Sequence, residues 1–222
     1  MGTPALVFDF GGPVLLTPFE LVDISAPGTA AHDLLDGRGP LAPPDRPDPD
    51  WVALQRGDLT ERDYWDHRAV EWSESGGGEP TIQALIAVLY DPPRHEMIRE
   101  GAWQLMSQAR AAGRHVGVLT NDLRHFHSPE WVDQMHILDY VEVIVDGSVE
   151  GVLKPDRRLY ELMADRLGVA FEDMVFIDDQ WPNVLGAREL GIPTVHFDVT
   201  DPDRSYDQAR ELMGLPPLVE RP

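Results

Sequence analysis

Polar side chains that can handle a phosphoryl group follow several short apolar segments of the sequence. Asp9 lies at the end of ALVFDF, Thr120 and Asn121 end HVGVLTN, and the pair Asp178–Asp179 follows MVFI. Carboxylates suit Mg²⁺, which is commonly held by one or two of them together with a substrate phosphate. Adjacent aspartates close to a third repel one another unless a cation lies among them. The pattern therefore predicts a carboxylate site for a divalent cation, with Mg²⁺ as the cofactor.

The only lysine of the chain, Lys154, is the candidate positive group for this site. Of eighteen basic residues, seventeen are arginine. An ammonium is a compact point charge on a flexible stem, whereas a guanidinium is a wide planar fork, so the two are not interchangeable. Three carboxylates, one ammonium and one hydroxyl form a set suited to phosphate chemistry.

These groups need a scaffold that brings strand ends together, and the sequence alternates strand and helix patterns. Apolar runs predict strands near residues 5–10, 115–120, 141–145, 174–177 and 194–197, and helical periodicity predicts helices near 98–112 and 157–167 and one that ends at 190. Such alternation predicts an α/β fold, a doubly wound, Rossmann-like parallel sheet covered by helices on both faces. Ligands bind beyond the carboxyl ends of such strands, where the candidate residues lie.

A helical insert interrupts the alternation between the first and second strands. Residues 39–50 contain five prolines, and Thr60 with Asp63 forms a capping-box pattern that predicts a helix start. An insert that leaves next to the end of the first strand is placed to cover the active edge of the sheet. We expect a core domain of residues 1–16 and 100–222 and an α-helical cap domain of residues 17–99.

Length and charge limit the class of protein. The chain has 222 residues, a formal net charge of -21 and no cysteine, which fits one globular domain with an insert and excludes disulfides and thiolate sites. The negative charge disfavours nucleic acids and anionic membranes as partners. The sequence shows neither a signal-peptide pattern nor a membrane span. We expect a cytoplasmic protein, monomeric or homodimeric, that acts on a small phosphorylated molecule.

Four segments, taken in order, resemble the motifs of the haloacid dehalogenase-like superfamily, in the branch with a small helical cap. FDFGG resembles the first motif, VLTN the second, GVLKPDRRLY the third and FIDDQWPNV the fourth. This resemblance implies that Asp9 is the nucleophile and that Thr120 and Lys154 hold the phosphoryl oxygens. It implies a Mg²⁺-dependent phosphohydrolase of a small metabolite that works through an aspartyl-phosphate on Asp9.

The resemblance also assigns the metal and substrate contacts. The implied metal ligands are Asp9, the backbone carbonyl of Gly11, Asp178 and Asp179, with Asp178 either a ligand or a support behind the ligands. The implied substrate contacts are Asn121, Gly11 and Gly12. Asn183 is expected to have a local structural role.

One position departs from the phosphatase pattern. Gly11 stands where phosphatases of this superfamily usually carry an aspartate that protonates the leaving group. A missing general acid commonly costs a factor of ~10²–10⁴ in rate. Either the substrate has a good leaving group, such as an anomeric or acyl phosphate, or another residue substitutes, or turnover has been lost. His67, His125 and His127 are the candidates for substitution, although each is also explained as a bystander.

Two alternatives stay open. In a 2-haloacid dehalogenase Asp9 attacks carbon without a metal, a reading that the pair Asp178–Asp179 disfavours. A non-catalytic binding protein of the same fold would keep the site and lack turnover. The tryptophans of the insert could line a pocket, but helical spacing favours packing for them: Trp51, Trp65 and Trp72.

Overall fold

A computed structural model describes residues 4–217, and this part of the chain forms two compact units. Within it, the first unit comprises residues 4–15, 98–122 and 136–217, and the second comprises residues 16–97 and 123–135. The domain boundaries expected from the sequence stay a prediction, and the structural division differs from them at residues 123–135. That segment joins the second unit because its helix α7 (Leu123–Phe126) packs on α5 (Ile82–Tyr90).

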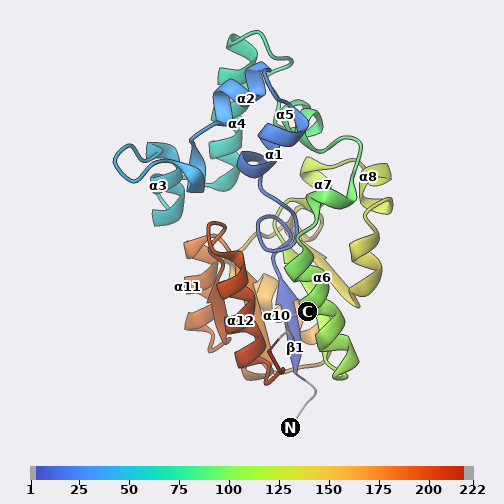
Figure 1. The fold of residues 1–222 in the computed structure, drawn as a ribbon. Helices are drawn as coiled ribbons and strands as arrows, with labels where there is room; N and C mark the ends of the chain where they lie inside the picture. The colour runs from blue at the N-terminus through green and yellow to red at the C-terminus, as the bar shows by residue number, and fades with distance from the viewer. Residues whose placement is uncertain (1–3, 218–222) are drawn as a thin grey trace. The chain divides into compact units, whose positions relative to one another are not determined.

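The first unit contains a five-stranded, all-parallel sheet, which confirms the predicted α/β fold (Figure 1). Its strand order is β3-β2-β1-β4-β5, so β1 lies at the centre between β2 and β4. Strands covered on both faces are expected to be continuously apolar, and all four residues of β1 are fully buried. The strands are β1 (Ala5–Phe8), β2 (His115–Thr120), β3 (Val143–Asp146), β4 (Met174–Asp178) and β5 (Thr194–His196).

Helices cover both faces of the sheet, as a doubly wound fold requires. On one face, α10 (Arg157–Leu167) packs on β2 and β3, and α11 (Trp181–Glu189) packs on β4 and β5. On the other face, α6 (Glu100–Ala111) contacts β2, and α12 (Pro202–Leu212) contacts β4 and β5 (Figure 1). The apolar stripe of α10 explains its position, since Leu159, Tyr160 and Met163 belong to the core beneath the sheet.

Short elements complete the first unit at the ends of its strands. They are η3 (His136–Tyr140), α9 (Gly147–Glu150) and η4 (Phe171–Asp173). The loop that carries Lys154 lies between α9 and α10, and it contains no regular structure of its own. Its conformation therefore depends on contacts with neighbouring elements.

The second unit is helical in the residues described. Its capping box is present as predicted: Thr60 accepts a hydrogen bond from the Asp63 backbone, and the Asp63 side chain accepts one from the Thr60 backbone. Its elements are α1 (Pro18–Ser25), α2 (Ala30–Leu35), η1 (Gly39–Leu41), α3 (Pro49–Arg56), α4 (Glu61–Glu74), α5, η2 (His95–Met97), α7 and α8 (Pro129–Asp133).

Aromatic residues form the centre of this helical unit. Phe19 stacks on Trp65 with ring centroids 5.4 Å apart, and Trp51 meets Tyr64 edge-on at 5.7 Å. Trp65 and Trp72 are only 4% and 5% exposed. The tryptophans of the insert therefore pack within it, which agrees with the spacing argument.

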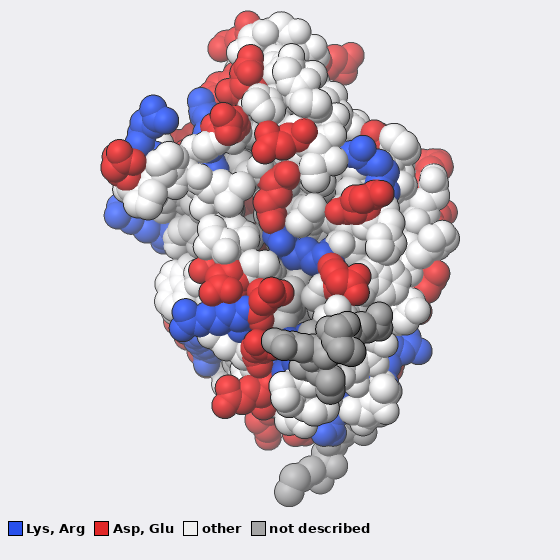
Figure 2. Space-filling view, viewed as in Figure 1, with Lys and Arg blue, Asp and Glu red and all other residues white. Residues whose placement is uncertain are grey.

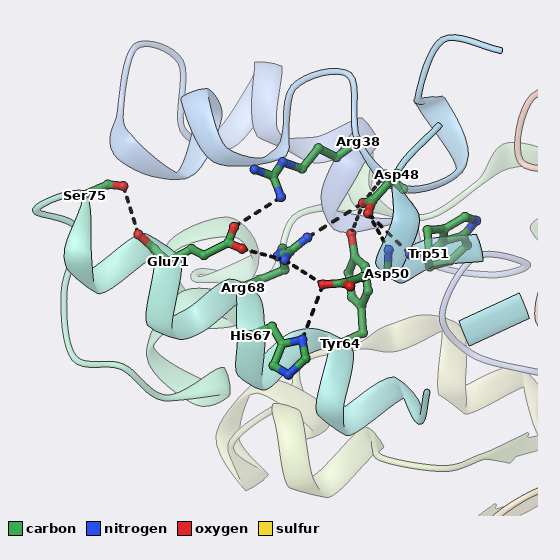
Figure 3. Close-up of polar contacts among 10 residues, drawn as sticks. Arg38, Asp48, Asp50, Trp51, Tyr64, His67, Arg68, Glu71 and Ser75 are labelled. Atoms are coloured by element: carbon green, nitrogen blue, oxygen red, sulfur yellow. Dashed lines mark hydrogen bonds and ion pairs between the residues drawn. The ribbon is translucent and has the colours of Figure 1, made fainter. Parts of the chain in front are cut away.

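A buried arginine holds the proline-rich segment to α4 (Figure 3). Arg68 is 3% exposed and donates hydrogen bonds to Asp50 at 2.9 Å and to Glu71 at 2.7 Å. Asp48 accepts the Tyr64 hydroxyl at 2.8 Å. These contacts join Asp48 and Asp50, at the end of the proline-rich segment, to α4.

The surface reflects the composition. On the face drawn in Figure 2, acidic side chains are scattered over the molecule, in keeping with 39 acidic and 18 basic residues in the chain. Within residues 4–217, no helix is long and apolar enough to cross a membrane.

Candidate active site

Three aspartates converge at the carboxyl edge of the sheet. Asp9 follows β1, Asp178 ends β4, and Asp179 follows directly. The parallel pairing of Phe8 with Ile177 brings the two strand ends together, and the Asp9 backbone donates to the carbonyl of Ile177 at 2.8 Å. One carboxylate oxygen from each aspartate lies within 4.8 Å of the others. The adjacency expected from the strand pattern is therefore present.

Lys154 reaches this group from the loop before α10. Its Nζ donates to Asp9 Oδ1 at 2.7 Å and to Asp178 Oδ2 at 2.6 Å, and its side chain is 1% exposed. The Nζ also lies 5.4 Å from the centre of the Phe176 ring. The ammonium is thus a buried bridge between two carboxylates that are far apart in the sequence.

Asp9 and Asp178 share the Lys154 ammonium, and burial and charge shift the pKa values of Asp9 and Lys154. Burial raises the pKa of Asp9 to about 7; the Lys154 ammonium opposes this rise and Asp178 adds to it. Burial alone lowers the pKa of Lys154, but the charges of Asp178 and Asp9 outweigh burial and the net direction is upward. Lys154 therefore stays protonated, and three carboxylate oxygens within 4.8 Å of one another suit the binding of a cation.

Asp178 is held by hydrogen bonds on both of its oxygens. Asn183 Nδ2 lies 3.2 Å from Oδ1 and 3.1 Å from Oδ2, and the Gln180 backbone donates to Oδ1 at 2.8 Å. The carbonyl of Asn183 accepts the Tyr160 hydroxyl at 2.8 Å. Asp178 is fully buried, and these contacts suit it to orienting Lys154. The local structural role expected for Asn183 stays a prediction, and its amide contacts Asp178.

The turn after β1 fits closely around Asp179. Gly12 has φ +78°, and a Cβ placed on it would lie 2.8 Å from the Asp179 Cγ, so only glycine fits there. Arg99 Nε donates to the Gly12 carbonyl at 2.5 Å, and the Tyr206 hydroxyl donates to the Pro13 carbonyl at 2.7 Å. The turn is therefore fixed from two distant elements.

Gly11 is exposed and has room for a side chain. A Cβ placed there would lie 3.8 Å from Asp9 Oδ2, an ordinary van der Waals distance. The fold therefore does not require a glycine at position 11, and the side chain of a general acid would fit there.

Thr120 ends β2 and Asn121 follows it, at the same edge of the sheet. Val118 pairs with Phe8, so Thr120, two residues further on, lies beyond the end of β1. Thr120 is 6% exposed. The Asn121 side chain contacts the Lys154 backbone, where its Oδ1 accepts the Lys154 N–H at 2.7 Å. Its expected contact with substrate stays a prediction, and these hydrogen bonds indicate a different role.

The histidines considered as replacement acids belong to the second unit. His127 stacks on Trp131 with ring centroids 3.8 Å apart, and burial lowers its pKa to about 3. It is therefore neutral at physiological pH. His67 Nδ1 lies 3.3 Å from Asp50, and the carbonyl of His125 accepts a hydrogen bond from Gln83.

His196 also contacts the site, and the sequence pattern did not predict this contact. It ends β5 beside β4, and its Nε2 donates to the Asp179 carbonyl at 3.1 Å. Its ring centroid lies 5.2 Å from that of Trp181. The sequence indicated only that His196 lies near the end of the last strand, which pairs with β4 in the sheet.

The family profile described as a haloacid dehalogenase-like hydrolase matches residues 5–191. The chain belongs to this family. The match spans β1 to β4 and the helical insert, and it ends before β5. The chain is therefore a member of a hydrolase family.

Two curated relatives show how far this likeness extends. The chain is 26% identical over 218 residues to acyl-CoA dehydrogenase family member 10 from Mus musculus, covering 96% of this chain and 19% of that protein. It is 34% identical over 115 residues to phosphatase MT3486 from Mycobacterium tuberculosis (strain CDC 1551 / Oshkosh), covering 52% of each. The chain thus spans about a fifth of the first relative and about half of the second.

Solved structures of this family share the fold. The HAD hydrolase YfnB from Bacillus subtilis, bound to magnesium, has a TM-score of 0.63 and 16% identity, covering 89% of this chain and 88% of that one. A dehalogenase has a TM-score of 0.61 and 19% identity, covering 89% and 85%. At this identity the likeness shows the fold alone.

Proposed function

We propose that the protein is a Mg²⁺-dependent phosphohydrolase of small phosphorylated metabolites, with Asp9 as the nucleophile. The observation that supports this most is the buried Lys154 ammonium between Asp9 and Asp178, with Asp179 beside them. A phosphatase relative supports the reaction class, and a family structure bound to magnesium supports the cofactor. The proposed partner is this small molecule, with no nucleic acid or membrane involved. We also propose that the protein is cytoplasmic and is a monomer or a homodimer.

The residues present fit Mg²⁺. Hard divalent cations take oxygen ligands, and the three aspartates offer carboxylate oxygens within 4.8 Å of one another. Asp9, Asp179 and the carbonyl of Gly11 would hold the ion, with Asp178 as a further ligand or a support. When bound, Mg²⁺ supplies positive charge that offsets the charge of the phosphoryl oxygens and polarises the phosphorus.

The chain's own residues account for the bond changes. Lys154 occupies Asp9 Oδ1, which leaves Oδ2 as the attacking oxygen. In the first step the bond from Asp9 to phosphorus forms and the bond from phosphorus to the leaving oxygen breaks. A water then attacks phosphorus, inorganic phosphate leaves and the Asp9 carboxylate is restored. Lys154 and the Thr120 hydroxyl offset charge on the phosphoryl oxygens in both steps.

Gly11 sets the substrate class within this proposal. It offers no proton to the leaving oxygen, so a leaving group of low pKa needs the least assistance. Acyl and anomeric phosphates meet this condition. We therefore propose that such compounds are turned over faster than simple alkyl phosphates.

A dehalogenase is the second candidate, because a solved dehalogenase has the same fold. In that reaction Asp9 attacks carbon and releases a halide, with no need of a cation. The pair Asp178–Asp179 favours the phosphatase, because clustered carboxylate oxygens suit a divalent cation and the dehalogenase reaction uses none. A binding protein without turnover is the third candidate.

A screen of phosphorylated metabolites separates these candidates. We expect phosphate release that requires Mg²⁺, that EDTA abolishes and that Asp9→Asn reduces to background. Asp165→Asn, a change at an exposed aspartate of the same unit, should keep the parent rate. Halide release from 2-haloacids that is unaffected by EDTA would establish the dehalogenase instead. Beryllofluoride binding without multiple turnover would establish the binding protein.

A further inference from the structure

We propose that Asn121 is a positioning residue that fixes the backbone of Lys154 and so aims its ammonium at Asp9 and Asp178. The inference rests on the proposed function, because it gives Lys154 the task of holding phosphoryl oxygens. It differs from the substrate contact that the sequence resemblance implies for Asn121. The contacts of the asparagine amide separate the two roles.

The Asn121 amide brackets the peptide unit of Lys154. Oδ1 accepts the Lys154 N–H at 2.7 Å, and Nδ2 lies 3.4 Å from the Lys154 carbonyl oxygen. The two residues are 8% and 5% exposed. The short contact engages the amide oxygen with a backbone donor that is buried and needs a partner. Both polar ends of the side chain therefore face the lysine backbone.

The anchor is rigid on its own side. Asn121 directly follows β2, an inner strand of the sheet, and its carbonyl accepts the Ser148 N–H at 2.7 Å. A Cβ on Gly147 would lie 3.2 Å from the Asn121 carbonyl oxygen and 2.7 Å from that of Val152. The glycine thus lets the end of β3 close around Asn121 and the start of the lysine loop.

The far side of the loop is packed as closely. A Cβ on Gly186, in α11, would lie 2.7 Å from the Pro155 Cβ and 3.1 Å from the Pro155 carbonyl oxygen. The lysine loop therefore lies between α11 and the ends of β2 and β3. The Asn121 side chain joins this loop to the end of β2 by hydrogen bonds to the Lys154 backbone.

Positioning matters here because the loop has no regular structure and the lysine side chain is flexible. Its Nζ must stay at 2.7 Å and 2.6 Å from two carboxylates. A misplacement of 1 Å at a reacting centre costs a rate factor of about 10². We therefore expect loss of the bracket to lower kcat, with little effect on KM.

The composition supplies a spectroscopic test. Lys154 is the only lysine and the chain has two asparagines, Asn121 and Asn183. A protein labelled with ¹⁵N-lysine gives one backbone amide signal, that of Lys154. With ¹³C-asparagine added, a coupling across the hydrogen bond from this amide to the Asn121 Cγ is expected in the unmodified protein. A Lys154 amide without this coupling would overturn the proposal.

Substitutions provide the second arm. In Asn121→Ala the Lys154 amide should exchange with solvent about tenfold faster, whereas Asn121→Asp keeps the acceptor oxygen and should retain protection. On p-nitrophenyl phosphate, Asn121→Ala should lower kcat about 10- to 100-fold with KM nearly unchanged. A raised KM with unchanged exchange would show that Asn121 contacts substrate and would overturn the proposal. If Asn121→Ala does not fold, the coupling in the unmodified protein decides alone.

The two proposals fail separately. The coupling and the exchange rate are measured without substrate, so they test the bracket whether or not the protein turns over any phosphate. A protein with the coupling and no phosphatase activity would contradict the proposed function and keep the bracket. An active protein without the coupling would contradict the bracket and keep the proposed function.

Discussion

Replacing Lys154 by methionine tests the electrostatics of the site. The substitution keeps most of the side-chain volume and removes an ammonium that lies 2.7 Å from Asp9 and 2.6 Å from Asp178. These three side chains are between 0% and 9% exposed, so water cannot replace the lost charge. Removing one partner of a buried ion pair destabilises a protein by about 3–5 kcal/mol. We expect Lys154→Met to lose stability in this range at pH 8 without metal.

The loss of stability in Lys154→Met should depend on pH. In the native protein the pKa of Asp9 is raised from 3.8 to about 7, so between these values the folded state binds more protons than the unfolded state. Stability therefore falls as pH rises through this window. Without Lys154 the pKa of Asp9 rises further, because the ammonium opposed the shift. At low pH Asp9 of the variant is therefore protonated, and the cost of its unpaired buried charge disappears. The difference between the variant and the parent should therefore be smaller at pH 5 than at pH 8.

Urea unfolding at both pH values, with and without Mg²⁺, measures these effects. Arg157→Met is the matched control: it removes an exposed cation from the same loop end, where Arg157 pairs with Glu161. Such exposed pairs contribute about 0–1 kcal/mol, with little dependence on pH. Equal destabilisation by the two substitutions, or a larger loss at pH 5 for Lys154→Met, would refute the assignment of Lys154 as the counter-charge of the site.

Three further predictions concern the glycine turn and the metal. Gly12→Ala places a Cβ 2.8 Å from the Asp179 Cγ at a residue with left-handed φ, so the Mg²⁺ affinity measured by titration should fall at least tenfold. The control is Gly113→Ala, which also changes a glycine with left-handed φ but makes no close contacts, and it should bind Mg²⁺ as the parent does. Gly11→Asp should raise turnover of alkyl phosphates by ~10²–10⁴ and reduce the dependence on leaving-group pKa, measured with a series of phosphate esters; an unchanged dependence would contradict the account of Gly11. Because a bound cation favours the ionised form of Asp9, whose pKa is otherwise about 7, Mg²⁺ should bind more tightly at pH 8 than at pH 6 and release protons at pH 6.5. Calorimetry in two buffers that differ in ionisation enthalpy detects this release, and identical heats would count against it.

Elements with a strong local pattern were predictable from the sequence. The helix Arg157–Leu167 has the expected bounds, since Asp156 caps its start and Gly168, at φ +68°, ends it. The third strand begins at Val143 and was expected from residue 141. Strand starts are less distinct because sheet pairing, which is non-local, decides them.

The convergence of the site followed from topology, and its finer contacts did not. Apolar runs that end in Asp9 and Asp178 imply a shared sheet edge once the sheet is parallel. The amide of Asn121 on the Lys154 backbone and that of Asn183 on Asp178 depend on loop geometry. A sequence shows which residues can form hydrogen bonds, and loop packing decides which partners they meet.

The grouping of residues 123–135 with the second unit was also beyond the sequence pattern. This segment follows the second motif directly, and the expected core domain of residues 100–222 includes it. Its Trp131 indole donates to the Tyr90 carbonyl at 2.9 Å, and the Gln83 side chain donates to the carbonyl of His125 at 2.9 Å. These long-range contacts have no local sequence signature.

The nucleophilic role of Asp9 is tested most directly by trapping its phosphorylated form. The protein is mixed with an aryl phosphate and Mg²⁺, quenched in acid within a single turnover, and digested for peptide mass spectrometry. We expect one phosphoryl group on Asp9, absent with EDTA and absent in Asp9→Asn. Phosphate release by Asp9→Asn at the parent rate, or a phosphoryl group on another residue, would contradict it.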